Sequence, residues 1–105
     1  MKIPKQITIG KVVYKIKRIF KWFGKAQVGG MNFVKETLLL RKELKKNPEW
    51  ESRVFFHEIG HAILRAMETN FPFLAKHSHD EDFVNELSLH IKKVYEELIE
   101  EQNRV

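Results

Sequence analysis

The alternation of apolar and polar residues predicts strands in the first 45 residues of the chain. Val12–Ile19 alternates partly between apolar and basic side chains, which is typical of a half-buried strand. Two further strands are predicted at residues 26–32 and 37–40, and residues 7–9 form a short β-leaning segment before a turn at Gly10-Lys11. We therefore expect a three-stranded, mainly antiparallel sheet.

Two long helices are predicted after the sheet. Asn47 is a good N-cap and Pro48 suits the first helical position, so a helix should run from Pro48 to residue 68 or 69. It is apolar nearly all round, which predicts a buried central helix. Gly60 inside it costs about 1 kcal/mol relative to alanine, and we expect close packing against the sheet as its reason.

The second helix is predicted at residues 80–101, and the fold class is therefore α+β. Its apolar stripe follows a spacing of three and four residues, which is typical of a helix with one buried face. The stripe consists of Val84, Leu87, Ile91, Val94 and Leu98. In the sheet, Gly29-Gly30 suggests a bulge or a close backbone approach.

Length and composition predict one domain spanning residues 1–105. The hydrophobic fraction of 43% and the charged fraction of 31% are those of a soluble globular protein, and no apolar run is long enough to span a membrane. The chain has no cysteine, which excludes a disulfide framework and favours a cytoplasmic setting. It also restricts metal ligands to His, Glu and Asp.

The net charge of +5 is concentrated in the N-terminal third. A basic stretch interleaved with aromatic residues is able to bind nucleic acid or a lipid surface, but we interpret it as the solvated face of strands and expect no nucleic-acid partner. The basic residues are Lys11, Lys15, Lys17, Arg18, Lys21 and Lys25.

The sequence His57-Glu58-Ile59-Gly60-His61 lies within the first predicted helix. Residues four apart share one helix face, so His57 and His61 can bind one Zn²⁺ ion, the usual metal for such a pair. Glu58, one residue further round, is placed to act as the general base. Two histidines and a glutamate among apolar residues would be costly to bury unless they were paired or ligated.

A catalytic zinc site needs a third protein ligand. Glu81 continues the apolar stripe of the second helix back to its start, whereas Glu86 falls on the solvent side. We therefore predict Glu81 as the ligand, with Asp80 second and His77 and His79 third. A structural role competes for Glu81, because Ser78-His79-Asp80-Glu81 fits a capping box.

His77 and His79 fall in the connection before the second helix. They are either ordinary loop histidines or residues that stabilise the oxyanion of a tetrahedral intermediate.

The two motifs together, His57-Glu58-Ile59-Gly60-His61 and Glu81-Asp82-Phe83-Val84-Asn85, resemble those of gluzincin metallopeptidases. The second is similar to the Glu-x-x-Ala-Asp pattern of the membrane-embedded Ste24 and HtpX type. The resemblance implies Glu81 as the zinc ligand and places Asn85 where that family has an aspartate bracing a ligand histidine. Asn85 can accept a hydrogen bond but lacks the charge that raises the basicity of a ligand.

In size and element order the chain looks most like the minigluzincins, soluble minimal proteins similar to the catalytic core of those peptidases. The resemblance implies a zinc endopeptidase, and such minimal forms can be latent, with a terminal segment in the cleft. Residues 1–6 and 102–105 are the candidate segments.

The leading hypothesis is hydrolysis of a peptide or protein substrate by water activated at zinc, with Glu58 moving the proton. The strand at residues 26–32 is a candidate for binding an extended peptide by strand addition. The alternatives are a metal-stabilised scaffold without turnover and a basic binding module. Self-association of the chain is compatible with each of these hypotheses.

Overall fold

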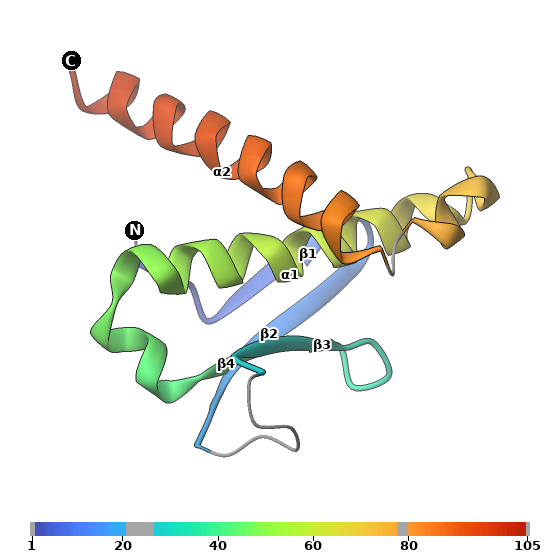
Figure 1. The fold of residues 1–105 in the computed structure, drawn as a ribbon, viewed down its shortest axis with the longest axis horizontal. Helices are drawn as coiled ribbons and strands as arrows, with labels where there is room; N and C mark the ends of the chain where they lie inside the picture. Colours follow the sequence, from blue (N-terminus) through green and yellow to red (C-terminus); the bar gives the residue numbers. More distant parts are fainter. Residues whose placement is uncertain (1, 21–26, 78–79, 105) are drawn as a thin grey trace.

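The computed structural model describes residues 2–20, 27–77 and 80–104. They form four strands, two long helices and two short 3-10 helices (Figure 1). In chain order the elements are β1 (Gln6–Ile9), β2 (Val12–Ile19), β3 (Gly29–Asn32), β4 (Thr37–Arg41), η1 (Lys42–Lys46), α1 (Pro48–Glu68), η2 (Pro72–Lys76) and α2 (Glu81–Asn103). The predicted α+β class is confirmed.

The sheet has four strands in the order β1-β2-β4-β3, and it is mixed. β1 pairs antiparallel with β2 and β3 pairs antiparallel with β4, but β2 and β4 are parallel neighbours. The prediction of three mainly antiparallel strands was therefore wrong, because residues 6–9 form a strand and β4 inserts between β2 and β3. Alternation along a strand reports which side chains are buried and does not determine which strands pair.

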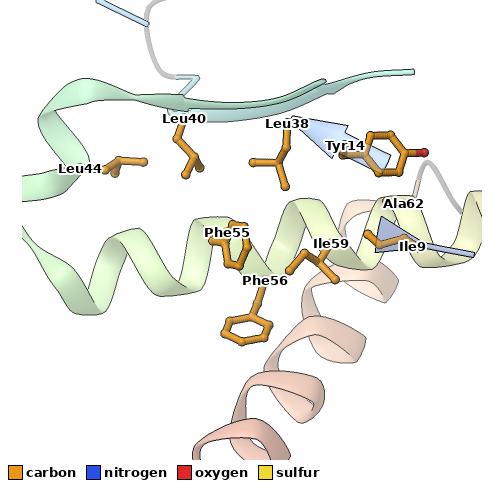
Figure 2. Close-up of a cluster of buried hydrophobic side chains, with 9 residues drawn as sticks. All are labelled: Ile9, Tyr14, Leu38, Leu40, Leu44, Phe55, Phe56, Ile59 and Ala62. Carbon is orange, nitrogen blue, oxygen red and sulfur yellow. The ribbon is translucent and has the colours of Figure 1, made fainter. Parts of the chain in front are cut away.

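The core lies between the sheet and α1 (Figure 2). Leu38, Leu40 and Leu44 are fully buried and point from β4 and η1 toward Phe55 and Ile59 of α1. Tyr14, Ile9 and Ala62 extend the same cluster. At about 25 cal/mol per Å² of apolar surface, this contact is the main source of stability in so small a chain.

α1 is the middle layer of the fold, with the sheet on one side and α2 on the other (Figures 1 and 2). Phe56 points away from the sheet, and its ring centroid lies 5.5 Å from that of Tyr95 on α2. A Cβ on Gly60 would lie 3.2 Å from Val84 Cγ1 and 3.5 Å from Ser88 Cβ. The expected close packing at Gly60 is therefore against α2 and not against the sheet.

The apolar stripe of α2 is buried only in its first half. Val84 is fully buried, whereas Val94 is 56% and Leu98 is 60% exposed, and α2 diverges from α1 toward its C-terminus (Figure 1). Buried Lys92 joins the two helices by a 3.0 Å ion pair to Glu49 of α1, and it also forms a 2.9 Å ion pair with Glu96 on its own helix. Within the described ranges, neither long helix combines the length and hydropathy needed to cross a membrane.

The helix starts follow N-capping chemistry. The side chain of Asn47 accepts a hydrogen bond from the N–H of Trp50, as predicted for α1. At α2 the N-cap is Asp80, whose carboxylate accepts from the N–H groups of Asp82 and Phe83. The predicted capping box was wrong, since Asp80 itself caps the helix and Glu81 occupies the first helical position.

The N-terminal basic stretch lies partly outside the described residues. Lys11, Lys15 and Lys17 are exposed, as the solvated-face interpretation predicts. Arg18 instead points to α1 and forms a 2.6 Å ion pair with Glu51. Lys21 and Lys25 lie outside the described ranges.

The close approach predicted at the paired glycines is confirmed at Gly29, where an added Cβ would lie 2.5 Å from Val54 Cγ1. We predict that Gly29→Ala lowers the free energy of unfolding by about 1–3 kcal/mol, because β3 must move away from α1. Urea denaturation measures this. Adding Val54→Ala removes the opposing methyl group, so the double variant should lose less than the two single losses summed. A Gly29→Ala protein as stable as wild type would contradict the predicted clash.

Candidate metal centre

His57 and His61 lie one turn apart on the same face of α1, with ring centroids 4.9 Å apart. Both are partly buried, and their side chains are 21% and 15% exposed. The opposite face of this turn packs into the core through Phe55, Ile59 and Ala62. Burial of that face fixes the rotation of α1 and so directs both imidazoles to the other side.

Glu81, at the start of α2, lies against both histidines. Its Oε2 is 2.6 Å from His57 Nε2 and its Oε1 is 3.2 Å from His61 Nε2. Each of the three residues offers a ligand atom, and these atoms all lie within 4.8 Å of one another. Three side chains, at most 24 residues apart in sequence, thus bring three possible metal-ligating atoms close together.

The position of Glu81 follows from helix packing. Val84, one turn further along α2, is fully buried against Gly60 of α1. Residues three apart share a helix face, so Glu81 is directed toward the turn of α1 that carries His57 and His61. Its side chain is 69% exposed, which leaves it room to adjust.

Glu58 is buried, with 7% of its surface exposed, and it contributes to the wall of the same cleft. Burial in low-dielectric surroundings disfavours the charged carboxylate, and the nearby charge of Glu81 adds repulsion. Together they raise the pKa of Glu58 to about 8. Glu58 Oε2 also lies 3.4 Å from the Cβ position of Gly29, which places the carboxyl beside β3.

An open cleft of about 710 Å³ lies over these four side chains. Its walls are residues 27–31 of the β3 segment, one face of α1, and Glu81, Asn85 and Leu89 of α2. Such a volume is in the range of small-molecule and peptide side-chain pockets. The cleft gives a ligand direct access to the histidines.

The other predicted site residues lie elsewhere or outside the described residues. Asp80 is the cap of α2, and Glu86 is exposed beside His90. His77 stacks on Phe83 at 5.0 Å and is not among the described residues that line the cleft. His79 lies outside the described ranges, so an oxyanion role for His77 or His79 stays a prediction.

Asn85 lines the cleft one turn after Glu81, and its bracing role stays a prediction. Of the described parts of the two terminal segments, residues 2–6 and 102–104, none lines the cleft.

Sequence analysis did not identify Trp50 and Arg53, which also line the cleft. Their spacing could have predicted this position, because Trp50 and Arg53 precede His57 by seven and four residues. Both therefore fall on the helix face that carries the histidines.

Comparisons with protein-family models, with curated proteins and with solved structures found no match for this chain.

The raised pKa of Glu58 predicts a pH dependence of stability in the metal-free protein. Between about pH 4.5 and 8 the folded state holds a proton that the unfolded state has lost. Stability should therefore fall as pH rises, by up to about 1.4 kcal/mol per pH unit, and level off above pH 8. Urea denaturation in the presence of a chelator, repeated across this range, measures the slope.

Glu58→Gln is the control, since it keeps the shape and removes the titration. The variant should gain stability over wild type progressively with rising pH. A difference between the two proteins that is constant across the range would contradict the assignment.

Proposed function

We propose that the chain is a zinc-dependent metalloendopeptidase of the minigluzincin kind, hydrolysing peptide bonds in the cleft over His57, His61 and Glu81. The convergence of these three ligands beside the buried carboxyl of Glu58 carries the proposal. The two-motif resemblance noted from the sequence supports it.

The donor set fits zinc. Two neutral imidazoles and one carboxylate are a common ligand set for a catalytic site with an open fourth position. Tetrahedral bonds of 2.0–2.1 Å separate ligand atoms by about 3.3 Å. His61 Nε2 and Glu81 Oε1 are already 3.2 Å apart. His57 Nε2 donates to Glu81 Oε2 at 2.6 Å, and a small outward shift of the exposed Glu81 side chain reaches the required separation.

A zinc ion held by these residues would act as a Lewis acid, polarising the scissile carbonyl and lowering the pKa of water. Glu58 then performs the proton transfers. In its ionised form, which the positive charge of bound zinc would favour, Glu58 accepts the proton of the attacking water and delivers it to the nitrogen of the leaving amine. Burial of Glu58 beside β3 limits its contact with bulk water, and Glu58 lines the same cleft as the three proposed ligands.

β3 is the element of the cleft suited to hold the substrate backbone. Among the described residues it is an edge strand, since β4 is its single neighbour there, and Gly29, Gly30 and Met31 line the cleft. An extended peptide can add to such an edge through main-chain hydrogen bonds. The absence of side chains at Gly29 and Gly30 allows close approach.

Without the Glu81 carboxylate, the protein should no longer bind zinc when one equivalent of zinc is added. We expect Glu81→Ala to weaken zinc affinity more than about 100-fold, because loss of a direct ligand should exceed the 10–100-fold cost of losing an outer hydrogen-bond partner. Competition with a chromophoric chelator measures the affinity. Glu86→Ala, on the exposed face of the same helix, is the matched control and should bind zinc as wild type does. Equal losses in the two variants would contradict the ligand assignment.

Glu58→Gln should keep zinc and lose peptidase activity. We expect a 10²–10⁴-fold fall in kcat, the usual contribution of general acid–base catalysis. Cleavage of a quenched fluorescent peptide library, with zinc content measured on the same samples, tests both statements. Undiminished cleavage by Glu58→Gln would overturn the mechanism. Zinc binding by the wild type without cleavage of any peptide would instead favour a metal-stabilised scaffold.

A further inference from the structure

Arg53 lies in the cleft on the same face of α1 as the ligand histidines. It precedes His57 by four residues, which is about 6 Å along the helix axis at 1.5 Å per residue. An extended peptide advances about 3.3 Å per residue. Arg53 is therefore about two substrate residues from the metal centre, within reach of a side chain next to the scissile bond.

Arg53 is the one chargeable residue among the described residues of the cleft to which the proposed chemistry gives no role. Among the described residues that line it, the others that can carry charge are His57, His61, Glu58 and Glu81. The proposed function assigns all four to the metal and to proton transfer. Arg53 is exposed and has no role in that chemistry.

The acidic neighbour of Arg53 on its own helix is engaged elsewhere. Glu49 precedes Arg53 by one turn, but its carboxylate accepts a 3.0 Å hydrogen bond from Lys92 of α2. That hydrogen bond is the main cause of the lowered pKa of Glu49, and Arg53 is the weakest contributor. No ion pair joins Arg53 to another residue in the described part of the chain.

Two partly exposed apolar side chains line the same cleft as Arg53. Trp50, one turn earlier, is 44% exposed, and Leu89 on the facing wall of α2 is 41% exposed. A cleft that offers a guanidinium together with an aromatic and an aliphatic side chain suits a carboxylate on a short methylene stem. The planar donors of arginine match a carboxylate in a bidentate geometry.

We propose that Arg53 is a specificity-determining residue, selecting peptides that carry a carboxylate within about two residues of the bond placed at the metal centre. The inference rests on the proposed function for the position of that bond. The carboxylate comes either from an acidic side chain or from the C-terminus of a peptide, since both present the same two oxygens.

Peptide binding tests this without turnover. The probes are fluorescent peptides of one neutral sequence in which a single position is Glu, Gln or Lys, all with amidated C-termini. A fourth probe is the Gln peptide with a free C-terminus. Fluorescence anisotropy with the zinc-loaded Glu58→Gln protein gives a Kd for each, and the same titrations with metal-free wild type give a second set.

We expect the Glu peptide to bind up to about fivefold more tightly than the Gln peptide, the upper range for an exposed ion pair. In the Glu58→Gln background, Arg53→Gln should remove this preference, Arg53→Glu should reverse it in favour of the Lys peptide, and Arg53→Lys should retain part of it. The preference should shrink as salt is added. Arg104→Gln is the matched control, because Arg104 is exposed at the far end of α2 and should leave the ratios unchanged.

Each result bears on the inference. Equal Kd values for the Glu and Gln peptides, no binding by any peptide, or a preference that survives Arg53→Gln would overturn it. Tighter binding of the free C-terminus than of the Glu side chain assigns the carboxylate to the peptide end and supports selection by Arg53. Failure of the proposed function would appear separately, as wild-type protein that shows the binding preference but cleaves none of the peptides.

Discussion

The close crossing of α1 and α2 at Gly60 is the constraint on which the rest of the site depends. Because Gly60 has no side chain, Val84 packs so close to it that a Cβ added at Gly60 would lie only 3.2 Å from Val84 Cγ1. Val84 is fully buried at this contact. Glu81 precedes Val84 by one turn, so the same contact carries its carboxylate to His57 and His61. The helix-propensity cost of glycine, about 1 kcal/mol, is offset by this packing.

α1 has a different role on each of its faces. Phe55, Ile59 and Ala62 face the sheet and supply the core, while Gly60 faces α2. The third face, running from Trp50 through Arg53 to the two histidines, lines an open cleft. A helix that is covered on two sides has a fixed rotation, and this fixes the direction in which the polar residues of the third side point.

Much of the fold could be predicted from the sequence. The limits of α1 were predicted to within a residue because Asn47 and Pro48 are strong start signals, and β2 was predicted from its alternation. The parallel pairing of β2 with β4 could not be predicted, because pairing depends on contacts distant in sequence. The stripe through Val94 and Leu98 correctly marks a helix, but it overstates burial, since α2 diverges from α1 toward its C-terminus.

The positions of the three candidate metal ligands could be predicted from the sequence, whereas the cap of α2 and the role of Arg53 could not. The spacing of His57 and His61 fixes their shared face, and the stripe of α2 placed Glu81 with them. The capping box that competed for Glu81 is contradicted by the structure, because Asp80 and Ser78 are both good N-caps and sequence does not decide between candidates two residues apart. Arg53 was missed although its spacing from His57 places it on the histidine face, because spacing alone does not show that an open cleft lies over that part of the helix.

Zinc K-edge X-ray absorption on the protein loaded with one equivalent of zinc tests the central assignment most directly. The account predicts four-coordinate zinc at 2.0–2.1 Å, with scattering from two imidazoles that falls to one in His61→Ala. Zinc surrounded by oxygen alone, or an imidazole count unchanged by His61→Ala, would contradict it.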